Sequence, residues 1–191
     1  MRSLAAAHRG VRRLMQSDGM QINISNEILA EIGKVSVLFG FIEASLGEII
    51  GRIITVGGRR WELGVIVTAE LSFKQRVSAV NSLLVLALGK DNEVVAQFDR
   101  VKPLLFQAEQ ERNTVVHSVW AKDAEAVDPH AVIRMKATTK PRHGLRTDFV
   151  AMSLEDLRRT TTLLATAYGQ LSLFELHFHG DSEDDRSEAE E

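Results

Sequence analysis

Residues 111–120 read Glu-Arg-Asn-Thr-Val-Val-His-Ser-Val-Trp and close a long segment with helical periodicity. Each residue of a helix advances by about 100°. Asn113 and His117 would therefore share one face, about 40° apart. Arg112 would lie about 140° round from His117, but its long side chain can reach across the turn. Val115 and Val119 fall on the opposite side, so the pattern predicts a polar triplet on a helix that is anchored in a core.

Three amphipathic helices are predicted up to this point. The first covers residues 26–55, where apolar residues recur at alternating spacings of four and three. The second lies between a capping box that begins at Ser72 and a closing Gly89, after a connector that holds a short helix at residues 65–69. The third covers residues 91–120, and Pro103 is expected to kink or split it because proline removes one backbone hydrogen bond.

After Trp120 the periodicity changes to the alternation that is typical of strands. Residues 131–139 and 145–152 alternate in this way on either side of a short connection, which predicts a β-hairpin. A last helix is predicted from the capping sequence at Ser153 to about Phe178. The fold class is therefore mainly α, with four principal helices and a small β-hairpin inserted before the last one.

Composition and charge limit the class of protein. The chain has no cysteine, which excludes disulfides, Fe–S clusters and thiolate zinc sites and favours a cytoplasmic location. Residues 1–20 hold four arginines and one acid. We expect this segment to be a disordered arm, or an extension upstream of the true start of translation at Met15 or Met20. A transit peptide is the alternative. Residues 180–191 are acidic and predicted to be disordered, which leaves 21–179 as the domain.

The body between these ends is balanced in charge, so it lacks the basic excess of a dedicated nucleic-acid binder. A membrane span in the first helix is also disfavoured. Glu43, Glu48 and Arg52 lie within its apolar part, and each would cost about 2.5–3.5 kcal/mol at the centre of a bilayer. No membrane partner is expected.

The pattern Arg112-Asn113-x-x-x-His117, followed by Ser118 and Trp120 near the end of a helical hairpin, resembles the signature of the HEPN superfamily. That signature is an arginine, four to six residues and then a histidine, usually with a polar residue directly after the arginine. The resemblance covers about residues 25–120. It implies a HEPN-like helical bundle and a homodimeric ribonuclease of toxin or defence type that needs no metal and no other cofactor.

The three residue types suit the cleavage of RNA by its own 2′-OH, which needs a base, an acid and a cation. His117 can serve as base or acid because imidazole titrates near neutral pH. Arg112 can stabilise the charge on the phosphorane, and Asn113 can orient the histidine or the phosphate. The products would carry 2′,3′-cyclic phosphate and 5′-OH ends. RNA is the expected substrate, and an antitoxin protein is a possible partner.

Other interpretations of the motif stay open. In a structural one, Arg112 pairs with Glu43 or Glu48 and His117 caps the end of its helix. The chain could also be a non-catalytic HEPN domain that binds RNA or a nucleotide, or an α-helical partner or scaffold protein. Some HEPN toxins have a tyrosine two residues after the histidine, which a partner adenylylates; here that position is Val119, and the one tyrosine is Tyr168.

The predicted hairpin is rich in cations. Between residues 131 and 147 there is no acid, and the basic residues are Arg134, Lys136, Lys140, Arg142 and Arg146. They predict an arm that contacts RNA phosphates, or else a strand edge whose charges discourage pairing with other chains. The pair His177 and His179, before the acidic segment, is more simply the end of a helix than a metal site.

A C2 homodimer with the third helices near its axis is predicted, because two apolar stripes exceed what a short bundle readily covers. The stripes are Ile28, Ile32, Val35, Phe39, Ile42, Leu46, Ile49 and Ile53 in the first helix, and Val94, Phe98, Val101, Leu105, Ala108, Val115 and Val119 in the third. Such a dimer would bring two copies of the triplet together and supply a second histidine.

Overall fold

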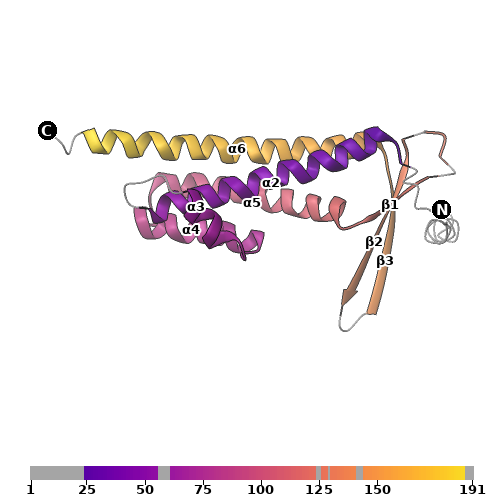
Figure 1. Cartoon of the computed structure of the whole chain (residues 1–191), viewed down its shortest axis with the longest axis horizontal. Coiled ribbons are helices and arrows are strands. Elements are labelled where there is room, and N and C mark those ends of the chain that lie inside the picture. The colour runs from indigo at the N-terminus through magenta and orange to yellow at the C-terminus, as the bar shows by residue number, and fades with distance from the viewer. Residues whose placement is uncertain (1–23, 56–60, 124–125, 129, 141–143, 188–191) are drawn as a thin grey trace. The chain divides into compact units, whose positions relative to one another are not determined.

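The computed structural model describes residues 24–55, 61–123, 126–128, 130–140 and 144–187 (Figure 1). They form a mainly helical structure with a small antiparallel sheet before the last helix, as predicted. The elements are α2 (Asn26–Ile54), α3 (Trp61–Thr68), α4 (Phe73–Leu88), α5 (Glu93–Val116), β1 (Val119–Lys122), β2 (Val132–Lys140), β3 (Gly144–Met152) and α6 (Leu154–Ser187).

The chain divides into two compact units, and three helices contribute residues to both. The first unit contains the described residues up to Ser36 together with residues 111–162. The second contains residues 37–110 and the described part of 163–191. The candidate triplet and the whole sheet belong to the first unit, so the site can be described within that unit alone.

In the first unit, three antiparallel strands lie in the order β1-β2-β3 (Figure 1). The predicted hairpin is confirmed as β2 and β3, but a third strand, β1, was missed. β1 pairs only with Val132–Met135, so the rest of β2 pairs with β3 alone. The buried apolar side chains of this unit are Ile28, Val35, Val115, Ala121, Val132 and Leu157.

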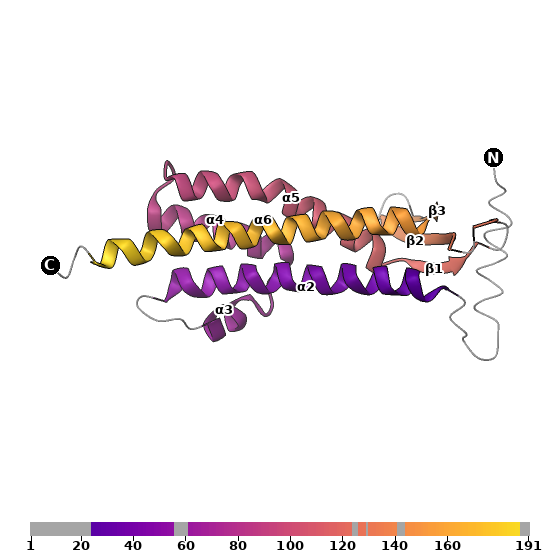
Figure 2. The same cartoon turned by 90° about the horizontal axis from the view of Figure 1, so that it is seen from above.

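In the second unit, side-chain contacts join the helices into a bundle. Phe41 of α2 and Tyr168 of α6 have ring centroids 5.5 Å apart, and Figure 2 shows these two helices running side by side. Phe98 of α5 lies 5.2 Å from Phe174 of α6. The largest fully buried side chains here are Phe98, Ile42, Leu46, Ile49, Ile50, Leu84, Leu105, Leu164 and Leu171.

The helix boundaries follow local chemistry. α4 begins with the predicted capping box, in which the Ser72 side chain accepts from the Gln75 backbone, and it ends at Gly89, whose φ of 87° suits glycine. α5 continues through Pro103 as one helix, so the predicted alternative of a split is wrong. Buried Val101 and Leu105 hold both sides of the proline in the core, which offsets the lost hydrogen bond.

A glycine contact positions α3 against α2. A Cβ atom on Gly64 would lie 2.0 Å from the carbonyl oxygen of Gly47, so the backbones approach too closely for any side chain. Thr68 donates to the Gly64 carbonyl at 2.7 Å and closes the helix. The short helix predicted in this connector is therefore present, and it begins earlier, at Trp61.

Two predicted helix ends are wrong. α5 stops at Val116 and not at Trp120, because residues 119–122 pair with β2. α6 extends beyond Phe178 to Ser187 and so includes part of the segment predicted as a disordered tail. Residues 1–23 and 188–191 lie outside the described part, so the predicted N-terminal arm does too.

The apolar stripes behind the dimer prediction are largely covered within one chain. Phe39, Ile42 and Leu46 of α2 are at most 3% exposed, and Phe98 and Leu105 of α5 are fully buried. Val119 is 46% exposed, but it belongs to β1. The stripes therefore do not supply a surface for a second copy of the chain. The homodimer stays a prediction, but unpaired apolar surface no longer supports it.

Candidate active site

The end of α5 is held by side chains of the segment that follows it and of β2. Ser118 donates to the Thr114 carbonyl at 2.6 Å, and the Trp120 indole donates to the Val115 carbonyl at 3.0 Å. Lys136 donates to the Asn113 carbonyl at 3.3 Å. Three of the four carbonyls that a helix end leaves without partners are thus satisfied. The chain can then turn sharply from helix into β1.

This turn carries His117. The residue directly follows the last helical residue, Val116, so it does not share a helix face with Asn113 as the sequence predicted. Its side chain is exposed, whereas Arg112 and Asn113 are partly buried. The imidazole is therefore presented to solvent by a turn whose backbone is anchored on both sides.

One guanidinium nitrogen brings the triplet together. Nη1 of Arg112 donates to Oδ1 of Asn113 at 3.0 Å and lies 3.0 Å from Nε2 of His117. An arginine has only donors, so Nε2 must be the acceptor in this contact. The predicted reach of Arg112 across the turn is confirmed, and it fixes the orientation of the ring.

The described contacts address two parts of the structural interpretation of the motif. Glu48, one of its proposed partners for Arg112, forms an ion pair with Arg52. The helix end is capped by Ser118, Trp120 and Lys136, and the contact that His117 makes is to Arg112. The imidazole is therefore free of the capping role.

Two cations of β2 reach the same turn. Arg134 and Lys136 alternate along the strand, so they share one face of the sheet. Nη1 of Arg134 donates to Oγ of Ser118 at 3.4 Å, and Lys136 bonds to the Asn113 carbonyl. Neither forms an ion pair with a carboxylate in the described part of the chain. The negative end of the α5 dipole favours both charges there.

Arg134 also carries an unmet donor. Its Nε is buried and has no hydrogen-bond partner among the residues that the structure describes. A buried donor without an acceptor costs about 1–3 kcal/mol, and such groups in native proteins often mark a site for a ligand or water. The Ser118–Arg134 contact is the feature of the site that the sequence did not predict, because it requires the register of β1 on β2.

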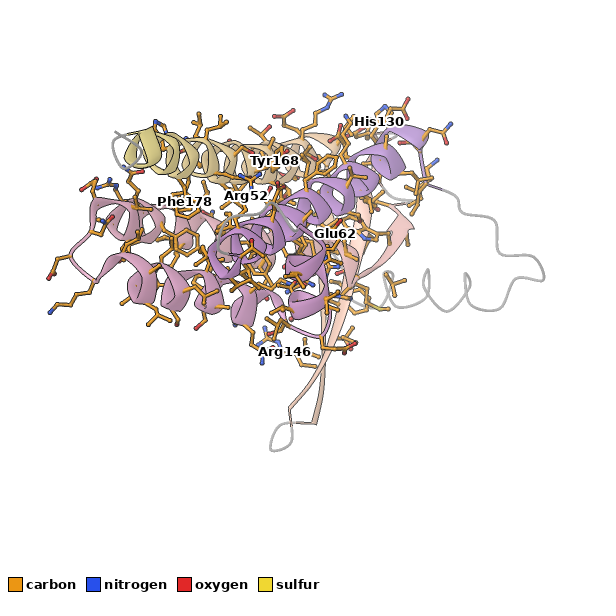
Figure 3. All side chains as sticks on the ribbon, turned by 60° about the vertical axis from the view of Figure 1, so that its left-hand side comes forward. Arg52, Glu62, His130, Arg146, Tyr168 and Phe178 are labelled. Carbon is orange, nitrogen blue, oxygen red and sulfur yellow. The ribbon has the colours of Figure 1, made fainter. Side chains whose placement is uncertain are left out.

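The other predicted cations of the hairpin do not share this position. Arg146 of β3 donates to Asp148 at 3.0 Å and is 78% exposed (Figure 3). Arg142 lies outside the described residues, as does the side chain of Lys140. The structure therefore brings Arg134 and Lys136 to the triplet and leaves Arg146 paired with an acid.

A metal site would need several histidine or acidic side chains close together within the described ranges. No group of three or more metal-ligating side chains is found among those residues. His177 lies on α6 with its Nδ1 2.7 Å from the Leu173 carbonyl, and the side chain of His179 is not described. None of the described helices has the length and apolar character that a membrane crossing requires.

Comparison with known proteins adds nothing to this geometry. No family model, no curated protein and no solved structure matches the chain.

Proposed function

We propose that the chain is a metal-independent endoribonuclease of the HEPN type, with a toxin or defence role, centred on Arg112, Asn113 and His117. It cleaves RNA by attack of a 2′-OH on the adjacent phosphorus. The products carry 2′,3′-cyclic phosphate and 5′-OH ends. The observation that supports this most strongly is the single guanidinium nitrogen of Arg112, which contacts both Asn113 and an exposed His117.

Each residue has a role that its contacts allow. In its contact with Arg112, Nε2 of His117 offers its lone pair to the guanidinium. When RNA binds, the phosphate oxygens attract the guanidinium, and Nε2 is released to take the proton of the 2′-OH. Asn113 accepts a hydrogen bond from the same nitrogen, Nη1, and limits the movement of the guanidinium. The same guanidinium then stabilises the negative charge of the phosphorane.

The reaction balances without a further reagent. The 2′-OH loses its proton to Nε2, O2′ bonds to phosphorus, and the bond from phosphorus to O5′ breaks. The leaving O5′ takes a proton from a second acid. One chain offers one histidine at this turn, so a second copy of the chain is the proposed source of that acid.

The test is a cleavage assay on single-stranded RNA with EDTA present. The wild type should cleave, and its products should carry cyclic phosphate ends. His117→Ala should lower the rate at least 100-fold, which is the scale of general acid–base catalysis. His177→Ala is the matched control, because it removes another exposed histidine. No cleavage by the wild type under any condition, or equal rates for wild type and His117→Ala, would reject the proposal.

A second candidate is a domain that binds RNA without cleaving it. The Arg112 contact favours it, because that bond occupies the lone pair that a general base needs. In this case Arg112→Ala would weaken RNA binding, and RNA would stay intact with every variant. Binding and cleavage measured on the same labelled oligonucleotide separate the two functions.

A further inference from the structure

An open depression lies on the sheet beside the candidate active site. Its volume is about 460 Å³, and it is lined by Arg134, Arg146, Thr147, Asp148, Phe149 and Val150. Sites for small ligands have volumes of roughly 300–1000 Å³. Arg134 links the depression to the active site, because the same side chain contacts Ser118, the neighbour of His117. A ligand in the depression would therefore lie next to the triplet.

The strand register places one acid among the cations of this face. Asp148 of β3 is the cross-strand partner of Lys136, and Arg146 is the partner of Thr138, so all four lie on one face. Lys136 does not use this neighbour, since its amino group bonds to the Asn113 carbonyl. Asp148 instead accepts from Arg146 through Oδ1.

The carboxylate of Asp148 keeps acceptor capacity. Its Oδ2 accepts no hydrogen bond from any described residue, and its side chain is 43% exposed. Each carboxylate oxygen has two lone pairs, so Oδ1 can also accept a second bond. An acid in this position is unexpected on a surface that only has to attract phosphates, because it weakens that attraction.

We propose that the depression is a base-recognition subsite for a guanine of single-stranded RNA, with Asp148 as the residue that reads the base. This rests on the proposed function of the neighbouring triplet. Unpaired bases expose their Watson–Crick edges to proteins. Guanine presents two adjacent donors there, N1–H and the exocyclic amine, which match the two oxygens of a carboxylate. Uracil presents one donor between two carbonyl oxygens, and these repel a carboxylate.

The surrounding cations complete the subsite. The exposed guanidinium of Arg146 is bonded to Asp148 and offers a flat surface for base stacking. Arg134 and Lys136, which have no described carboxylate partner, neutralise the phosphates on either side of the base. Phosphate attraction and base selection are thereby divided between β2 and β3.

The test measures binding with the His117→Ala variant of the full chain, so that cleavage does not interfere. The ligands are eight-residue oligouridine RNAs with one central guanosine, inosine, adenosine or uridine, at low salt. We expect guanosine to bind about tenfold more tightly than inosine, which lacks the exocyclic amine, and than uridine. Adding Asp148→Asn should remove this preference while total binding stays equal or rises.

Asp99→Asn is the matched control, because it removes another exposed carboxylate, on α5 in the second unit, and should keep the preference. Equal binding of the four RNAs, no binding, or a preference that survives Asp148→Asn would overturn the subsite. The comparison of guanosine with inosine uses native Asp148, so the test holds even if the asparagine variant unfolds.

Cleavage by the wild type is a separate measurement. Cleavage with equal affinity for the four RNAs would overturn the subsite and leave the proposed function intact. Selective binding of guanosine without cleavage by the wild type would support the subsite and reject the proposed function.

Discussion

Two clusters of charged residues, one in each unit, use similar side chains in opposite ways. In the second unit, Arg52 of α2, which is labelled in Figure 3, forms ion pairs with Glu48 of the same helix and with Glu175 of α6. In the first unit, Arg134 and Lys136 stand beside the triplet and bond to a hydroxyl and a backbone carbonyl. Arg52 is thus ion-paired with two carboxylates, whereas Arg134 and Lys136 bond to no carboxylate among the described residues.

Burial explains the first arrangement. The side chains of Arg52 and Glu175 are 20% and 15% exposed, so each charge needs a partner of opposite sign. Arg134 and Lys136 form no ion pair with a carboxylate in the part of the chain that the structure describes, and the negative end of the α5 dipole favours their charge. An ion network that is balanced internally indicates a structural role. Cations that bond to no carboxylate, beside an exposed histidine, indicate a site for an anion.

The largest expected effect concerns Arg112 of the triplet. Arg112→Ala should lower RNA cleavage by about 10²–10³, because it removes the donors for the phosphorane and the contact that orients His117. Arg112→Lys should restore little, since a point charge cannot reproduce the fork of donors. Rates are measured in single-turnover assays. Full activity of the lysine variant would show that only charge matters at this position.

The matching change in the structural cluster should act on stability. Arg52→Ala leaves Glu175 partly buried beside Glu48 without its cation. We expect a loss of about 1–2 kcal/mol in the free energy of unfolding, below the 3–5 kcal/mol of a fully buried pair because solvent still reaches the site. Denaturant titration measures it. An unchanged free energy, or a loss of RNA cleavage in protein that is still folded, would contradict the contrast between the clusters.

The cations of β2 should affect the salt dependence of RNA binding. Replacing Arg134 and Lys136 by alanine should lower the slope of log affinity against log salt by about 0.7 for each lost contact with single-stranded RNA. Lys74→Ala with Lys90→Ala removes the same charge from exposed positions of the second unit and is the control. Equal slopes for both double variants would show that Arg134 and Lys136 do not contact RNA phosphates, and that the hairpin is a charged strand edge only.

Local patterns predicted most of the fold. The spacing of apolar residues located the helices, and the alternation at 131–139 and 145–152 located β2 and β3 within one residue. The capping sequences at Ser72 and Ser153 marked true helix starts. These features depend on neighbours within a few positions, so the sequence contains them directly.

The end of α5 could not be predicted in this way. Val119 continues the apolar stripe of the helix, and it also suits a strand because it is β-branched. Pairing with Met135 of β2, which is distant in the sequence, decides for the strand. The same pairing brings Arg134 to Ser118. The triplet was thus visible in the sequence, and the surface around it was not.

The smallest effect concerns Glu175 and the sign of its pH dependence. Burial, and then the neighbouring charge of Glu48, raises the pKa of this carboxyl above its usual value, and Arg52 offsets only part of this. The folded state therefore binds its proton more tightly than the unfolded state does. The free energy of unfolding therefore falls as the pH rises from about 4.5 to the raised pKa of Glu175, and it stays at the lower value above that pKa. Glu175→Gln keeps the neutral form, so it should increase the free energy of unfolding at pH 7 by less than about 1 kcal/mol, because Arg52 already offsets part of the cost of burying the charge. The gain should disappear below pH 4. Unfolding followed by circular dichroism at both pH values measures it. A loss of stability at pH 7 would show that the ion pair with Arg52 outweighs the cost of burying the charge.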